Sequence, residues 1–227
     1  MQFRSLPGLI PYEEARRLQH QLVEERAIDQ IPDTVLFLEH FPVITRGRGL
    51  QWTGADRPKQ MPVPLGLPPE IGFCETERGG DLTYHGPGQL VIYPIVKLDG
   101  SGLGPKRDVA GFLRKLERVL IAVLLDLGLK AEARENATGI WIGERKLASI
   151  GIAVRKWVTY HGVAINGVND LSPFHLISPC GFSPEVMTRL QDFFEPGQAP
   201  WEKRQVGWRA DLEERFKKVL KRWGPPF

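Results

Sequence analysis

Apolar side chains recur every third or fourth residue in three stretches of this chain, which is the spacing of one face of a helix. The longest stretch, from residue 107 to 127, has apolar positions at Val109, Phe112, Leu116, Val119, Leu120, Val123 and Leu127. Gly128 follows this stretch directly, and glycine is common at the position just after a helix. A second stretch begins after Pro11 and carries Ala15, Leu18 and Leu22. The third, near the C-terminus, carries Trp208, Leu212, Phe216, Val219, Leu220 and Trp223.

Short apolar runs lie between these helices and predict strands. They cover residues 34–39, 43–45, 71–76, 90–98, 139–142, 146–154 and 158–165. Gly143 and Glu144 separate two of the runs and indicate a hairpin turn. With a short helix from Pro184, the order of elements predicts a mixed sheet flanked by helices. We therefore expect an α/β fold of the α+β type, in a single domain that covers residues 1–227.

Composition narrows the class of protein without indicating its chemistry. The 227 residues suffice for a substantial core, and 42% hydrophobic with 25% charged residues is ordinary for a globular protein. No apolar run approaches the roughly 20 residues that cross a bilayer, and we see no secretory signal at the N-terminus. The net charge of +3 is too small to suggest nucleic-acid binding. No set of four metal ligands has zinc-like spacing.

The two cysteines, Cys74 and Cys180, cannot form a disulfide framework, so we expect reduced thiols in a cytoplasmic protein. Cys180 lies between Pro179 and Gly181, just before the helix predicted from Pro184, where helix dipoles favour a thiolate. Cys74 lies in an apolar strand and is expected to be inert. A nucleophilic thiol needs a base, and the residues alone leave the choice open among His85, His161, His175 and Lys146.

The segment from Arg78 to Pro94, RGGDLTYHGPGQLVIYP, is dense in glycine. Glycine allows backbone N–H groups to approach a ligand closely, and the apolar run that follows would brace such a loop. The sequence therefore predicts a ligand-binding loop here. The alternative is a Gly/Pro-rich hairpin connection, since glycine-rich turns are common.

Four motifs occur in order along the chain: RGGDLTYHGPGQ from Arg78, KLASIG from Lys146, HGVAIN from His161, and PCG from Pro179. Together they resemble the lipoyl(octanoyl) transferase family of lipoate biosynthesis, over nearly the whole chain. The resemblance implies the fold shared by biotin and lipoate protein ligases. It also implies transfer of an octanoyl group from octanoyl-acyl carrier protein to a specific lysine of a lipoyl domain, with no cofactor, neither ATP nor a metal.

By position, the resemblance implies that Cys180 is the acylated nucleophile and Lys146 its acid–base partner, with His161 in a supporting role. Leu82, Ile150, Val163 and Ile165 are available for an apolar acyl slot. The residues that would bind the substrate fall in three segments: Arg78, Gly79, Gly80, Asp81, Leu82, Thr83, Tyr84 and His85; Ser149, Ile150 and Gly151; Gly162, Val163 and Ala164.

The implied partners are octanoyl-acyl carrier protein and the lipoyl domains of 2-oxoacid dehydrogenase complexes and of the glycine cleavage H protein. The enzyme is expected to be a monomer that binds neither nucleic acid nor membrane. An ATP-dependent lipoate or biotin protein ligase of the same fold is the main alternative, but such an enzyme has no use for Cys180. A non-catalytic binding module and a thioesterase-like hydrolase are the others, and intact Cys180 and Lys146 argue against the binding module.

Overall fold

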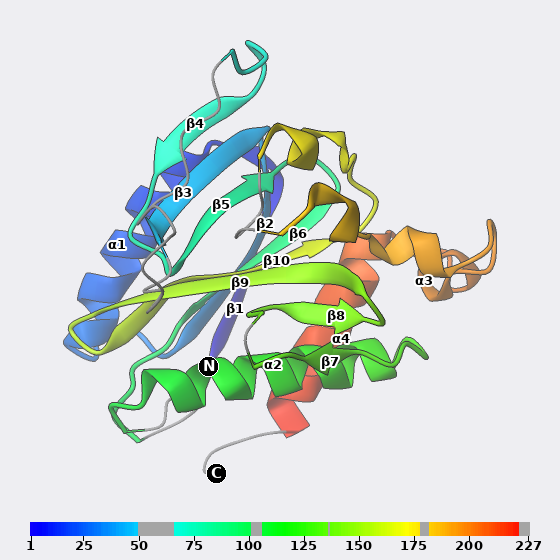
Figure 1. The fold of residues 1–227 in the computed structure, drawn as a ribbon. Coiled ribbons are helices and arrows are strands. Elements are labelled where there is room, and N and C mark those ends of the chain that lie inside the picture. The colour runs from blue at the N-terminus through cyan, green and yellow to red at the C-terminus, as the bar shows by residue number, and fades with distance from the viewer. Residues whose placement is uncertain (50–65, 101–105, 136, 178–181, 223–227) are drawn as a thin grey trace.

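The computed structural model describes residues 1–49, 66–100, 106–135, 137–177 and 182–222. Its strands form a seven-stranded sheet in the order β1-β2-β6-β10-β9-β8-β7 and a three-stranded sheet in the order β4-β3-β5 (Figure 1). The large sheet comprises β1 (Gln2–Ile10), β2 (Thr34–His40), β6 (Gln89–Ile95), β7 (Glu132–Ala133), β8 (Ile140–Ile142), β9 (Arg145–Arg155) and β10 (Val158–Asn166). The small sheet comprises β3 (Val43–Gly49), β4 (Gly72–Glu75) and β5 (Gly80–His85). Both sheets mix parallel and antiparallel pairs.

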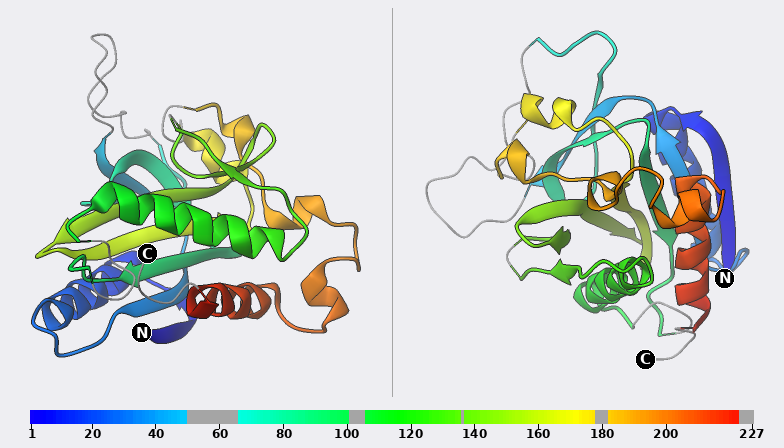
Figure 2. Two further views of the ribbon diagram at one scale, coloured as in Figure 1. Left: turned by 90° about the horizontal axis from the view of Figure 1, so that it is seen from below. Right: turned by 90° about the vertical axis from the view of Figure 1, so that its right-hand side faces the viewer.

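Helices cover both faces of the large sheet (Figures 1 and 2). On β2, Leu36 and Leu38 pack toward α1 (Tyr12–Ala27), whereas Val35 and Phe37 pack toward α2 (Val109–Leu125) and α4 (Trp208–Arg222). Successive side chains of a strand point to opposite faces, so β2 is apolar throughout because both faces are covered. The predicted fold class, a mixed sheet flanked by helices, is confirmed. The predicted helical position Trp223 lies outside the described residues.

Short helical turns fill the connection between β10 and α4. They are η1 (Ser172–Leu176), η3 (Pro184–Val186), η4 (Leu190–Phe193) and α3 (Pro200–Lys203). The helix expected from Pro184 is therefore one turn of 3₁₀ helix. Strand β1 was not predicted, because Pro7 and Gly8 interrupt its apolar pattern; it pairs in parallel with β2, with a register shift between Ser5 and Leu9.

The prediction of a loop throughout the glycine-rich segment is wrong, because Gly80–His85 forms strand β5, antiparallel to β3. Here glycine serves close packing between backbones. A Cβ on Gly47 of β3 would lie 2.3 Å from the carbonyl oxygen of Gly80. A Cβ on Gly151 of β9 would likewise lie 2.6 Å from the carbonyl oxygen of Gly79, and the Gly79 N–H donates to the Ile152 carbonyl at 2.9 Å. These contacts bring the small sheet against β9.

Candidate functional site

A pocket lies where the small sheet meets β9 and β10. It has about 430 Å³ of empty space, part of which is open to solvent. Its walls come from α1, β5, β6, β9 and β10 and the residues just before β5. The lining residues are Tyr12, Arg78, Thr83, His85, Val91, Tyr93, Lys146, Ser149, Ile150, Gly151, His161, Gly162, Val163 and Ala164.

The three segments expected to bind the substrate meet at this pocket. Ser149–Gly151 and Gly162–Ala164 line it from neighbouring strands, where Ile150 pairs with Val163 and Gly151 with Gly162. The first segment reaches the pocket through Arg78 and through β5. The antiparallel pairing of β9 and β10 thus brings together residues that are more than ten positions apart in the sequence. That these residues bind an acyl chain stays a prediction.

Alternation along β5 divides the first segment. Thr83 and His85 line the pocket, whereas Leu82 and Tyr84 pack on the other side of the strand against Phe174 and its neighbours. Gly79, Gly80 and Asp81 are not among the lining residues, and neither is Ile165, which packs in the core beneath α2. Of the four positions available for the apolar slot, Ile150 and Val163 line the pocket, although both also belong to the core beneath α2. Val91 and Ala164 are further apolar lining residues.

Arg78 lines the pocket but directs its donors into the protein. Its Nη2 donates to the carbonyl oxygens of Thr45 and Asp81, both at 2.7 Å, and to Thr45 Oγ1 at 2.8 Å. The side chain is buried. Because these bonds tie β3 to the start of β5, Arg78 supports the wall of the pocket.

Lys146 lies near the start of β9, with only 1% of its surface exposed. Its Nζ is 5.7 Å from the ring centroid of Trp141 and 5.3 Å from that of Phe182. Both distances are within the roughly 6 Å of a cation–π contact. Its carbonyl accepts from the Thr188 N–H at 3.0 Å, which holds the strand in place. Cys180, the expected nucleophile, lies outside the described residues; Phe182 follows it by two positions in the chain.

The pocket extends along β9 to a second group of polar side chains. His161 pairs with Ile152, six positions beyond Lys146 on β9, which is roughly 20 Å at the rise of a strand. Five buried aromatic side chains gather around this end, and we call them the Tyr–His cluster: Tyr12, His40, His85, Tyr93 and His161.

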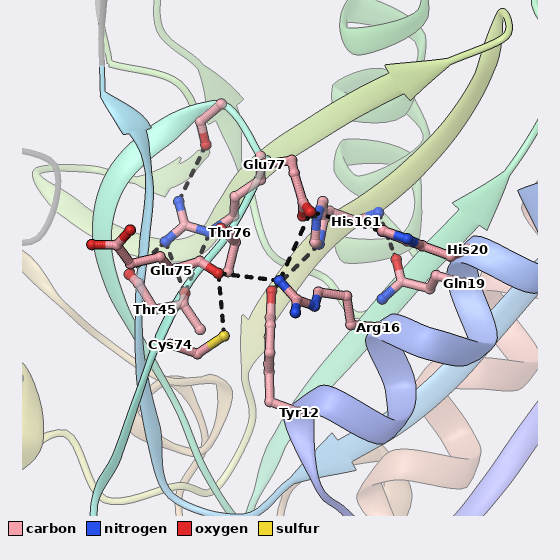
Figure 3. Close-up of polar contacts among 12 residues, drawn as sticks. Tyr12, Arg16, Gln19, His20, Thr45, Cys74, Glu75, Thr76, Glu77 and His161 are labelled. Carbon is pink, nitrogen blue, oxygen red and sulfur yellow. Dashed lines mark hydrogen bonds and ion pairs between the residues drawn. The ribbon is translucent and has the colours of Figure 1, made fainter.

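Hydrogen bonds join this cluster to the surface (Figure 3). Tyr12 Oη lies 3.4 Å from His161 Nδ1, and His161 Nε2 lies 3.4 Å from Glu77 Oε2. Glu77 is 28% exposed and lies 3.8 Å from the Arg16 guanidinium. Its hydrogen bond with His161 lowers the pKa of Glu77 to about 2. The Glu77 carboxylate therefore faces the cluster as an anion.

The cluster histidines are held neutral. Burial lowers the pKa of His40 to about 4. Its Nδ1 donates to the Ile10 carbonyl at 2.8 Å, so its Nε2 accepts from the Tyr93 hydroxyl, also at 2.8 Å. Burial holds the pKa of His85 well below its ordinary value, and the positive charge of the Arg78 guanidinium lowers it further. For His161, burial outweighs the attraction of Glu77 and lowers the pKa.

Backbone strain marks His161. Its φ is +56°, in the left-handed region, although the residue lies within β10. Its N–H donates to Gln19 Oε1 of α1 at 2.6 Å. A non-glycine residue in this conformation costs about 1–3 kcal/mol and persists where the surroundings enforce it.

The structure separates the candidate bases. Lys146, His85 and His161 line the pocket, whereas His175 is exposed and faces Glu185 at 3.8 Å. Cys74 donates to Glu13 Oε1 at 2.9 Å, and burial together with that carboxylate raises the pKa of its thiol to about 12. Cys74 is therefore a thiol at neutral pH and a poor nucleophile.

Sequence reasoning missed Tyr12, Val91 and Tyr93 as lining residues. Tyr12 looked like the polar start of a helix, and Tyr93 was absorbed into an apolar strand. The available signal was a hydroxyl within that strand, because buried tyrosines usually find a hydrogen-bond partner.

Within the described ranges, no group of three or more His, Cys, Asp or Glu side chains could hold a metal ion. No helix of the described part of the chain is long and apolar enough to span a membrane.

Comparison with protein families gives a match to the lipoyl protein ligase A/B catalytic domain over residues 11–206. The octanoyltransferase of Syntrophotalea carbinolica is 43% identical over 218 residues, covering 96% of this chain and 94% of its own. That of Gloeobacter violaceus is 46% identical over 186 residues, covering 82% of this chain and 78% of its own.

Solved structures with the same fold include lipoate-protein ligase A bound with ATP. It superposes with a TM-score of 0.65 at 19% identity, covering 97% of this chain and 86% of that one. A putative lipoate protein ligase from T. acidophilum gives a TM-score of 0.62, also at 19% identity, over 97% and 86% of the two chains. At this identity the likeness concerns the fold alone.

Proposed function

This chain belongs to the lipoyl protein ligase A/B family and, within it, to the octanoyltransferases, and we propose that it takes its octanoyl group from octanoyl-acyl carrier protein and passes it to a specific lysine of a lipoyl domain. It is thus an acyltransferase of protein lipoylation. The observation that carries the proposal is the sequence identity of 43% to an octanoyltransferase, over 94% of the length of that protein. The partly apolar pocket beside a buried lysine suits the same reaction.

The proposed first step forms a thioester on Cys180. The Cys180 thiolate attacks the carbonyl carbon of the donor thioester, and the bond from that carbon to the carrier's sulfur breaks. The Lys146 ammonium gives its proton to the leaving thiolate and becomes a neutral amine. Octanoyl exchange between two thiols is nearly balanced in energy, so the donor needs no activation by ATP or a metal.

The second step restores both residues. The neutral amine of the acceptor lysine attacks the Cys180 thioester, and the bond from carbon to Cys180 sulfur breaks. Lys146 takes the proton that the attacking nitrogen loses, which regenerates the ammonium beside a Cys180 thiolate. Because the product is an amide, this step runs downhill and draws the first one forward.

Three described features support these roles. Lys146 is buried and lines the pocket, and Phe182, near Cys180 in sequence, contacts its ammonium. Ile150 and Val163 supply apolar surface, and each methylene buried there contributes about 0.8 kcal/mol. We propose that the lining residues of the three expected segments bind the octanoyl chain.

A direct test is the mass of the intact protein after incubation with octanoyl-acyl carrier protein in the absence of ATP. We expect the mass increment of one octanoyl group, followed by its loss when a lipoyl domain is added. Absence of an adduct, together with ATP-dependent octanoylation of the lipoyl domain from free octanoate, would instead indicate a ligase.

The two cysteines provide matched variants for the same experiment. Cys180→Ser is expected to abolish the adduct, whereas Cys74→Ser is expected to keep it, because burial and the Glu13 carboxylate keep Cys74 in the thiol form. An adduct that persists in Cys180→Ser and disappears in Cys74→Ser would reverse the assignment of the nucleophile.

A further inference from the structure

The Lys146 side chain is buried, so a positive charge on it must be stabilised by neighbouring groups. Removing an ammonium from water costs several kcal/mol unless nearby groups stabilise the charge. Two aromatic rings lie within cation–π distance of Nζ, those of Trp141 and Phe182. Their centroids are 5.4 Å apart and their planes meet at 72°, so they form a corner around the ammonium.

Trp141 is fixed in this position. It is 2% exposed, and its Nε1–H donates to the Ala137 carbonyl at 2.9 Å. The Arg134 guanidinium also stacks on the ring, 4.6 Å from its centroid, and is itself held by Glu132 and Glu144. The ring therefore has little freedom to rotate away from Lys146.

The backbone of β8 is shaped to the same side chain. The pairing of β8 with β9 shifts register between Ile140 and Trp141, which places Trp141 opposite Lys146. Irregularities of this kind re-aim a side chain next to functional sites. Gly139, just before β8, has a φ of +141°, and a Cβ there would lie 2.7 Å from Lys146 Cε and 3.4 Å from Nζ.

We propose that Trp141 and Phe182 form an aromatic cage that positions the Lys146 ammonium for proton transfer, with Gly139 providing the space for its tip. The inference rests on the proposed function of Lys146, and it adds Trp141 as a positioning residue. Ring faces stabilise an ammonium without taking a proton from it.

The test measures acylation in a single turnover, as the rate constant at saturating octanoyl-acyl carrier protein and as the half-saturating concentration. A cation–π contact in a desolvated site is worth about 2 kcal/mol, or about 30-fold. We expect Trp141→Leu to lower the rate constant by roughly 10- to 100-fold. The half-saturating concentration should change little, because the ring is not among the pocket-lining residues. Trp141→Phe keeps a ring face and should restore most of the rate.

A matched control separates positioning from stability. Trp201 is also buried and packs on Phe194 with centroids 5.3 Å apart, but it does not line the pocket. Trp201→Leu should lower the melting temperature without a selective loss of the acylation rate constant. Phe182→Leu tests the second ring at a half-buried position, where folding is less at risk than with Trp141→Leu.

Three results would overturn the inference: equal loss of rate in Trp141→Leu and Trp201→Leu after correction for folded fraction, a change confined to the half-saturating concentration, or no gain from phenylalanine at position 141. These outcomes differ from failure of the proposed function, in which the unaltered protein itself forms no acyl adduct.

Discussion

The two ends of the pocket bury polar groups in opposite ways. At one end Lys146 is 1% exposed, and two aromatic rings lie within cation–π distance of its Nζ. At the other end the Tyr–His cluster buries three histidines and two tyrosines, and hydrogen bonds join them to one another, to Glu77, to Gln89 and to the backbone. Burial lowers the pKa of the cluster histidines and raises that of its tyrosines.

If the proposed function holds, the end with Lys146 takes part in the reaction, whereas the Tyr–His cluster only forms a wall of the pocket. Under the proposed function Lys146 exchanges protons with the substrate, and the faces of aromatic rings stabilise an ammonium without accepting its protons. The cluster side chains use their hydrogen-bonding groups within the protein. Replacing one of them leaves a buried partner without a hydrogen bond, which costs about 1–3 kcal/mol of stability. The comparison predicts that changes at Lys146 affect the rate, and that changes in the cluster affect stability.

The largest expected effect is at Lys146. Lys146→Ala should lower the rate of transfer by roughly 10²–10⁴-fold, the usual contribution of a general acid or base. Lys146→Arg should fail as well, because a guanidinium does not give up its proton in this pH range. Circular dichroism and the melting temperature should show that both variants stay folded.

Lys115 offers a matched control, since it is another buried lysine, on α2 and away from this pocket. Lys115→Met should keep normal transfer. If Lys146→Arg also transfers octanoyl at a near-normal rate, Lys146 acts through charge alone, and His85 or His161 becomes the base.

The lowered pKa of the cluster histidines should make the free energy of unfolding depend on pH. Burial holds the pKa of His40 at about 4, below the ordinary 6.5. Between these values the unfolded chain binds more protons than the folded one, so stability falls as pH falls from 6.5 toward 4. Each such histidine contributes up to roughly 1.4 kcal/mol per pH unit. Urea unfolding at pH 7, 6 and 5 measures the slope.

His40→Gln should reduce that slope, and the exposed His175, changed to Gln, should leave it unaltered. Transfer at saturating substrate should follow the folded fraction in both variants. If the His40→Gln protein is fully folded but transfers octanoyl slowly, the cluster takes part in the reaction, and the contrast between the two ends of the pocket is wrong.

The helices and most strands of the fold could be predicted because their apolar patterns are local. Residues 109–125 form a helix whose stripe faces the sheet, as the spacing predicts. Strand β5 could not be found, since its structure depends on pairing with β3 and on glycines whose close contacts involve distant backbones. Strand β1 could not be predicted either, because Pro7 and Gly8 interrupt its apolar pattern and because it is held in place by pairing with β2.

At the site, motifs located Lys146 and the two strand segments beside it, but not what surrounds them. Trp141 reaches the site through its pairing with Lys146, and nothing in its local sequence indicates it. Thr83 and Leu82 are neighbours in one motif, yet they face opposite sides of β5. A motif identifies a segment, and only the strand's alternation assigns each side chain to a face.

The smallest expected effect is at Thr83, which lies in the wall of the pocket and has a hydroxyl group to which neither end of the pocket gives a role. It is 4% exposed and lines the pocket, and among the described residues its Oγ1 has no hydrogen-bond partner. A buried hydroxyl without a partner lowers stability unless a ligand supplies one. We therefore expect this hydroxyl to bond the octanoyl donor.

Thr83→Val replaces the hydroxyl by a methyl group of similar size. The free energy of unfolding should stay the same or rise by about 1 kcal/mol, while the half-saturating concentration of octanoyl-acyl carrier protein rises roughly three- to tenfold, as expected for one hydrogen bond. Thr159→Val is the matched control: its hydroxyl donates to the Pro94 carbonyl at 2.6 Å, so stability should fall without a change in half-saturation. If Thr83→Val gains stability and binds the donor as before, Thr83 belongs to the wall. The substrate contacts would then be confined to the strands nearest Lys146.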